Sequence, residues 1–193
     1  MGATQYADKY GVNANPNYLI PSDGDDCTNF VSQCIYEGGG LPSVNDGNRK
    51  DNVSWYYSTI LGLGYYASYT WGGATNFQWH WGTDIHGNGE QDAYESIEVF
   101  SCEDALENWN YLYSNLYDGD VVQLIDPQKG TAYHSTIVDN QSDWNSIYQV
   151  SDIDIAEHTP KNVIQKSLYD ILIDKVNNNA DDELIIERIS EET

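Results

Sequence analysis

SDGDDCTNFVSQCIYEGGGLP, residues 22–42, predicts the helix on which the rest of the fold is built. Its apolar residues lie three and four positions apart, the spacing of one helix face: Phe30, Val31, Cys34 and Ile35. The glycines at 38–40 and Pro42 should then end the helix, because glycine favours the left-handed C-terminal position and proline cannot continue the hydrogen-bond ladder. We therefore expect a helix over about residues 26–37.

The segments around this helix predict an α+β fold. We expect short helices over 3–11 and 101–116, the second capped by Ser101 with Asp104 at the third helical position. β-Branched runs at 121–125 and 132–139, joined by a turn, predict a strand hairpin, and a third strand should lie between 146 and 158. The C-terminal third predicts either a helix followed by a strand or a short polar-tailed element. Helices followed by an antiparallel sheet favour α+β over an alternating βαβ arrangement.

Composition indicates one globular domain over residues 1–193, because 40% of the residues are hydrophobic and 13% are aromatic. Eight Lys and Arg against thirty-one Asp and Glu give a formal charge of −23, which would repel nucleic acid and anionic lipid. No apolar run is long enough for a membrane span, so we expect no membrane insertion. We also expect a monomer. The N-terminus lacks signal-peptide features, which leaves a cytosolic protein or the mature segment of an exported one.

Residues 43–92 show weak periodicity and many Trp, Tyr, Gly and Asn residues. We expect loops and short elements there, with an aromatic surface that forms a substrate groove or a variable loop region. The same aromatic side chains support a competing hypothesis, a non-catalytic module that binds glycan or cell wall by ring stacking. His80 and His86 lie in this segment, and their spacing of six fits no metal-ligand pattern on one element, so surface or packing roles are expected.

The three cysteines, an odd number, allow at most one disulfide and leave at least one free thiol. If Asp25 or Asp26 caps the helix, Cys27 lies in its first turn, where free N–H groups and the helix dipole favour a thiolate. Such a cysteine is either a nucleophile or a buried structural thiol. Cys34 falls two turns later on the apolar face and should be core, whereas Cys102 opens another helix and is a positional rival of Cys27.

A nucleophilic thiolate needs an imidazole within reach and a third group that orients it. His134 begins the strand run HSTIVD, so it is either this base or a half-buried strand histidine. The third group should lie across the following hairpin, because paired residues share a face. A connection centred near residue 143 would place Asp152 opposite His134, and one centred near 146 would place His158 there.

Metal sites are weakly supported by the sequence. NDGNRKDN and NNNADDE contain oxygen ligands, but neither has the glycine and terminal glutamate of a calcium loop, and no phosphate-binding loop is present. We expect no cofactor, and we keep a calcium-stabilised surface protein as a third hypothesis.

YADKYGVNANPNY and DCTNFVSQCIYEGG, with YDGDVVQL, HSTIVD and AEHTP later in the chain, resemble the putative amidase domain family of bacterial, often extracellular proteins. This family is related to the CHAP and NlpC-type hydrolases with a papain-like fold. The resemblance implies a cysteine amidase or peptidase that acts on peptidoglycan stem peptides and is secreted or attached to the cell surface.

The resemblance also implies roles for individual residues. Cys27 becomes the nucleophile and His134 the base, and His158 is preferred over Asp152 as the orienting residue. The oxyanion would be bound by the backbone N–H of Cys27 and a donor from the preceding segment, for which Tyr18 is the candidate, with Asp26 at the start of the helix beside it.

Overall fold

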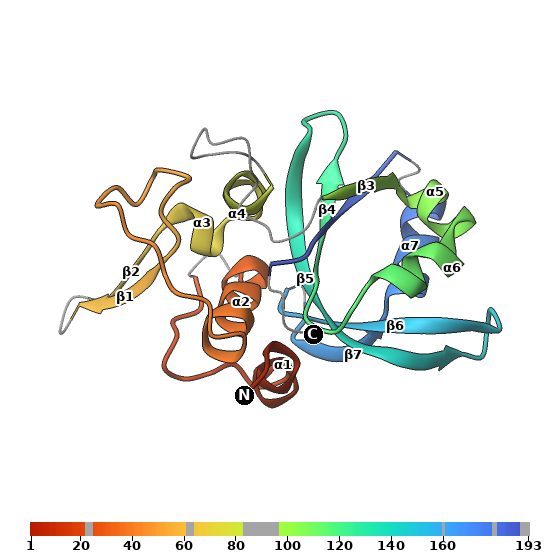
Figure 1. Cartoon of the computed structure of the whole chain (residues 1–193), viewed down its shortest axis with the longest axis horizontal. Coiled ribbons are helices and arrows are strands. Elements are labelled where there is room, and N and C mark those ends of the chain that lie inside the picture. The colour runs from red at the N-terminus through yellow and green to blue at the C-terminus, as the bar shows by residue number, and fades with distance from the viewer. Residues whose placement is uncertain (22–24, 61–63, 83–96, 160, 179–180, 190–193) are drawn as a thin grey trace.

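A six-stranded antiparallel sheet forms the centre of the molecule, with helices on both faces (Figure 1). The computed structural model describes the chain except residues 22–24, 61–63, 83–96, 160, 179–180 and 190–193. The strand order is β3-β8-β4-β5-β6-β7. The strands are β3 Glu98–Ser101, β4 Val121–Asp126, β5 Thr131–Asn145, β6 Val150–Glu157, β7 Val163–Ser167 and β8 Glu183–Glu187. The predicted α+β class, with a helix packed on an antiparallel sheet, is confirmed.

The predicted helices are present. They are α1 Ala3–Tyr10, α2 Cys27–Gln33 with its π-helical continuation η1 Cys34–Gly38, α5 Cys102–Glu107, α6 Trp109–Asn115 and α7 Leu168–Asn178. The helix expected over 101–116 is interrupted at Asn108, which leaves helical geometry at ψ 26°. Its cap is as expected, since Ser101 Oγ accepts from the Asp104 backbone N–H at 3.0 Å. Within the described residues, no helix combines the length and apolarity that a bilayer crossing requires.

The C-terminal third follows the first of its two predicted alternatives, a helix and then a strand. β8 enters the sheet between β3 and β4 and pairs antiparallel with both. As a result β4 has neighbours on both edges, and its first five residues are all buried. Because hydrophobic clusters cover both faces of the sheet, this central strand is buried on both sides, the polar Gln123 included.

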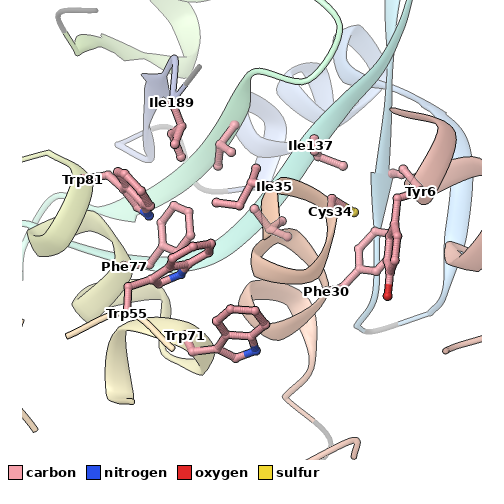
Figure 2. Close-up of a cluster of buried hydrophobic side chains, with 14 of the residues drawn as sticks. Tyr6, Phe30, Cys34, Ile35, Trp55, Trp71, Phe77, Trp81, Ile137 and Ile189 are labelled. Atoms are coloured by element: carbon pink, nitrogen blue, oxygen red, sulfur yellow. The ribbon is translucent and has the colours of Figure 1, made fainter. Parts of the chain in front are cut away.

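The described part of the aromatic segment 43–92 contributes three of its four tryptophans to the core, so the expectation of an aromatic surface is wrong for these three, whereas Trp79 is 40% exposed. Where described, it holds β1 Tyr57–Ile60, β2 Gly64–Ala67, α3 Tyr69–Gly72 and α4 Ala74–Trp81. Trp55, Trp71 and Trp81 are 0%, 1% and 7% exposed and pack against one another and against α2 (Figure 2). Periodicity could not reveal this core, because its elements are only four to eight residues long.

The two faces of β5 carry different cores. Ile137 belongs to the cluster that joins α2 to the aromatic segment, and Val138 belongs to the cluster under α5, α6 and α7. Successive side chains on a strand point to opposite faces, so one strand serves both. Cys34 is buried in the first cluster, as expected for a core residue, and Cys102 in the second. All three cysteines are free thiols.

Candidate active site

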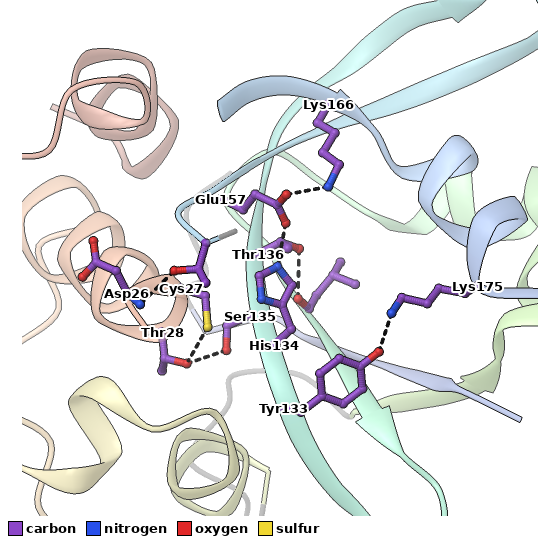
Figure 3. Close-up of polar contacts among 12 residues, drawn as sticks. Asp26, Cys27, Thr28, Tyr133, His134, Ser135, Thr136, Glu157, Lys166 and Lys175 are labelled. Atoms are coloured by element: carbon purple, nitrogen blue, oxygen red, sulfur yellow. Dashed lines mark hydrogen bonds and ion pairs between the residues drawn. The ribbon is translucent and has the colours of Figure 1, made fainter. Parts of the chain in front are cut away.

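The start of α2 is fixed against β5 by a buried hydroxyl pair. Thr28 Oγ1 and Ser135 Oγ lie 2.9 Å apart, and both side chains are fully buried (Figure 3). Cys27, the first residue of α2, is 5% exposed, and its Sγ lies 3.6 Å from Thr28 Oγ1. Because Ser135 follows His134 directly, this contact brings the thiol and the imidazole to the same junction between helix and strand.

Cys27 and His134 interact as an acid–base pair. Burial raises the pKa of the Cys27 thiol, but a hydrogen bond with His134 and the charge of that imidazole help to hold it below its ordinary value. The other cysteines behave oppositely. Burial raises the pKa of Cys34 well above its usual range, and burial raises that of Cys102 to about 11. Of the three thiols, only that of Cys27 has a pKa below its ordinary value.

His134 is held from its other side by Glu157. Its Nε2 lies 2.6 Å from Glu157 Oε2, and Lys166 Nζ lies 2.5 Å from Glu157 Oε1 (Figure 3). Burial lowers the pKa of His134, but hydrogen bonds with Cys27 and Glu157 outweigh it and raise the value to about 9. Burial raises the pKa of Glu157, and the contacts with His134 and Lys166 reverse this, so the carboxyl remains ionised.

The orienting partner of His134 is Glu157, and not the expected His158. The hairpin register explains the difference. Ile137 pairs with Ala156, so continuing the register by one residue puts Glu157 opposite Thr136. Thr136 shares a strand face with His134, two residues away, and Glu157 reaches the imidazole along the diagonal. In an antiparallel pair, the numbers of two opposite residues have a constant sum, and here that sum is odd. The two pairings that we considered from sequence, His134 with Asp152 or with His158, both require an even sum. A shift of one residue exchanges the two faces of a strand.

Asp152, the other candidate, lies far along the same hairpin, where it pairs with Asp143. Its Oδ2 accepts from Ser167 Oγ at 2.6 Å and from Asn145 Nδ2 at 2.9 Å. Both partners lie near the start of α7 or at the hairpin end, so this carboxylate fixes structure away from the thiol.

His158 binds the residue that precedes the cysteine. Its Nδ1 lies 2.6 Å from Asp26 Oδ2, its Nε2 lies 3.0 Å from the Tyr10 carbonyl oxygen, and its ring stacks on Phe30 at 3.8 Å. Both ring nitrogens face oxygen acceptors, so His158 connects Asp26 to the backbone of α1. Thr159 adds a third contact, since its Oγ1 accepts from the Asp26 N–H at 3.0 Å.

Three successive residues at the end of β6 thus organise both halves of the site. Glu157 orients His134, and His158 and Thr159 hold Asp26 beside Cys27. One short segment therefore sets the position of the imidazole and of the helix start together.

We predict that His158→Gln destabilises the protein strongly. Gln cannot reproduce the two hydrogen bonds and the stacked ring, and each buried polar group left without a partner typically costs about 1–3 kcal/mol of unfolding free energy. Urea denaturation would measure the change. The matched control is Lys129→Gln, which removes the exposed pair with Asp126 and should cost about 0–1 kcal/mol. Equal losses for the two variants would contradict a stabilising role for the His158 pair.

Asp26 and Tyr18 are placed differently from expectation. Asp26 occupies the N-cap position, but its side chain makes no cap hydrogen bond and instead binds His158 and Asn29. The N–H groups of the first turn of α2 consequently keep their donor capacity.

The Tyr18 hydroxyl donates to Glu37 Oε1 at 2.7 Å, and its ring packs on Tyr57. Its hydroxyl is therefore committed to Glu37 and is not presented to the thiol.

A cavity of about 620 Å³ adjoins the imidazole. Its lining includes Asp25, His134, Glu157 and Thr159, apolar residues of β4 and α7 such as Leu124 and Ile171, and the charged residues Lys166, Asp170, Asp174 and Lys175. His134, though not Cys27, thus lines a space large enough for part of a peptide. Within the described part of the chain, no group of three or more His, Cys, Asp or Glu side chains could hold a metal ion. His80 is a packing residue whose Nδ1 lies 2.5 Å from the Asn52 carbonyl, and His86 lies outside the described residues.

Comparison with known proteins finds the same family that the sequence segments resemble. A family described as a putative amidase domain matches residues 1–180. The uncharacterized protein YhbB of Bacillus subtilis (strain 168) is 44% identical over 62 residues, which are 30% of this chain and 19% of YhbB. The matched segment therefore spans about a fifth of that relative. No solved structure shows significant similarity to the chain. Because the family match covers nearly the whole sequence, the chain belongs to the putative amidase domain family.

Proposed function

We propose that this protein is a cysteine amidase or peptidase in which Cys27 is the nucleophile, His134 the general acid and base, and Glu157 the orienting carboxylate. Membership of the amidase domain family implies a hydrolase of amide bonds. The observation that carries the cysteine mechanism is the connected series from the lowered-pKa thiol through His134 to Glu157. Nucleophile, base and orienting group in one line are the arrangement that thiol hydrolysis requires.

The first step is attack on the amide carbonyl. Between the lowered pKa of Cys27 and the pKa of His134 near 9, the pair exists as thiolate and imidazolium. The sulfur adds to the carbonyl carbon, and the negative charge moves to oxygen. The Cys27 N–H, left uncapped by Asp26, is the donor we assign to that oxyanion.

The second step expels the amine. The His134 imidazolium gives its proton to the leaving nitrogen as the C–N bond breaks, which leaves a thioester on Cys27. The imidazole, still held by Glu157, then takes a proton from water, the resulting hydroxide adds to the thioester, and the acid product leaves as the thiolate re-forms. No step uses a group from outside the chain except water and substrate.

Peptidoglycan stem peptides are the substrate class we propose, and a secreted or surface location follows from that choice. The support is the resemblance of the sequence to cell-wall hydrolases together with the peptide-sized cavity beside His134. The charge of −23 gives no electrostatic attraction to an anionic wall polymer, so recognition must depend on local contacts.

The competing hypothesis of a glycan-binding module loses most of its stacking faces. Of the four tryptophans in the segment 43–92, Trp55, Trp71 and Trp81 are more than nine-tenths buried, and only Trp79, 40% exposed, presents a ring to solvent. Buried rings cannot stack on a sugar from solution, so the amidase hypothesis explains more of the observed structure.

Thiol mapping tests the proposal directly. We expect iodoacetamide to modify Cys27 alone in the folded protein, with a rate that reaches half its maximum below pH 9, because its thiolate is stabilised by His134. Peptide mass spectrometry would locate the label, and full labelling of all three cysteines in denaturant is the control. Preferential labelling of Cys34 or Cys102 in the folded protein would refute the assignment.

A further inference from the structure

A second cavity lies on the other side of the start of α2. It has a volume of about 310 Å³ and is lined by residues that include Asn29, Arg49, Tyr69, Trp71 and Gly72. Asp25, two residues before Cys27, lines both this cavity and the larger one beside His134. The two cavities therefore flank the nucleophile's end of the helix.

Among the described residues that line this second cavity, Arg49 is the one cation and Asp25 the one acid, and no ion pair joins the two. Among the residues that the structure describes, its guanidinium has no ion-pair partner and lies over the rings of Tyr66 and Tyr69, at 4.6 and 5.3 Å from their centroids. Its Nε is buried without a hydrogen-bond partner. The lysines of the larger cavity differ, since Lys166 pairs with Glu157 and Lys175 with Asp182.

The two tyrosines hold the guanidinium in a way that leaves its donors available. A cation–π contact uses the face of the guanidinium plane, whereas its N–H groups point outward within that plane. A carboxylate is the acceptor whose geometry matches this edge, because its two oxygens receive two parallel hydrogen bonds. In a chain with only eight basic residues and a charge of −23, a cation without an ion-pair partner is a favoured place for an anion to bind.

The position of His134 decides which part of the substrate reaches Arg49. His134 lines the larger cavity and must protonate the departing amine, so the leaving group belongs on that side. The acyl part then extends past Cys27 in the opposite direction, toward the cavity of Arg49. We propose that Arg49 binds a carboxylate on the acyl part of the substrate and so makes the enzyme selective for acidic acyl groups. This inference rests on the proposed cysteine mechanism.

Peptidyl vinyl sulfones test the inference, because their peptide occupies the acyl side and Cys27 adds to their double bond. Matched probes would carry Glu or Gln at the first, second or third residue from the reactive group. At one position we expect the Glu probe to modify Cys27 about 10-fold or more faster than the Gln probe, the size of a hydrogen bond to a charged group. Arg49→Gln should reduce that ratio to about one while leaving the Gln probe's rate within about twofold, on the same reasoning.

The neighbouring Lys50→Gln is the matched control, since it removes the same charge from an exposed residue that lines neither cavity and should keep the Glu preference. A preference that survives Arg49→Gln, or that appears at none of the three positions, would overturn the role of Arg49 while Cys27 labelling still supports the mechanism. Failure of every probe to label Cys27 would instead refute the proposed function, and the inference with it.

Discussion

Cys27→Ala is expected to abolish amide hydrolysis, and His134→Gln to reduce it by about 10²- to 10⁴-fold, the usual contribution of a positioned general acid and base. The thiol has no substitute, because Cys34 and Cys102 are fully buried and their pKa values are raised by that burial. His134→Gln keeps a side chain at the site but supplies no proton to the leaving amine. Amine release from purified peptidoglycan would measure both effects.

Cys102→Ala is the control for this first prediction. It makes the same chemical change at a buried cysteine in the other core, so activity should persist at temperatures well below unfolding. Circular dichroism should show that the Cys27 and His134 variants are folded. Amidase activity that survives in folded Cys27→Ala would exclude the proposed mechanism, whatever residue then proved responsible.

Glu157→Gln is expected to move the alkaline limb of the activity profile to lower pH and to reduce the maximal rate. The imidazolium of His134 is present below its raised pKa, near 9, and is lost as the pH rises through that value. Removing the carboxylate charge lowers this pKa, so the proton for the leaving amine is lost earlier. We expect a rate loss of about 10²-fold or more, because removal of the equivalent carboxylate from hydrolase triads costs up to about 10⁴.

Lys166→Gln gives a control of opposite sign. Lys166 Nζ lies 2.5 Å from Glu157 and offsets part of its negative charge. Without this lysine, the carboxylate stabilises the His134 imidazolium at least as strongly, so the alkaline limb should stay in place or move to higher pH. The measurement is the pH dependence of amine release for the three proteins. If Glu157→Gln leaves the limb unmoved, the carboxylate does not tune His134, and its role would be reduced to packing.

The helices and the main hairpin were predictable because their signals are local. The apolar spacing from Phe30 to Ile35 and the glycines after it define α2 and η1, and β-branched runs define β4 and β5. Position in the sheet was not predictable in the same way. β8 is inserted between two strands that come before it in the chain, and nothing in the residues Glu183–Glu187 encodes which neighbours they will have.

The sequence pointed to the cysteine and the histidine that the structure places together, but not to the carboxylate that contacts the imidazole. A cysteine at a helix start and a histidine on a strand carry signals in sequence, whereas the choice among Asp152, Glu157 and His158 depends on hairpin register. β5 and β6 change register twice between Val138 and Asp143, so the face that each acid occupies depends on irregularities that no local pattern shows. An odd sum at Ile137 and Ala156 put Glu157, and not His158, on the imidazole's face.

The segment Glu157–Thr159 also controls when the molecule becomes reactive. Cys27 leaves the ribosome long before His134 and Glu157, and in that interval its thiol is an ordinary one with no imidazole beside it. The partners arrive only when the end of β6 reaches Asp26 and the Thr28 and Ser135 hydroxyls meet. Under the proposed mechanism, chemical competence is therefore a property of the finished tertiary structure, which the growing chain does not yet have.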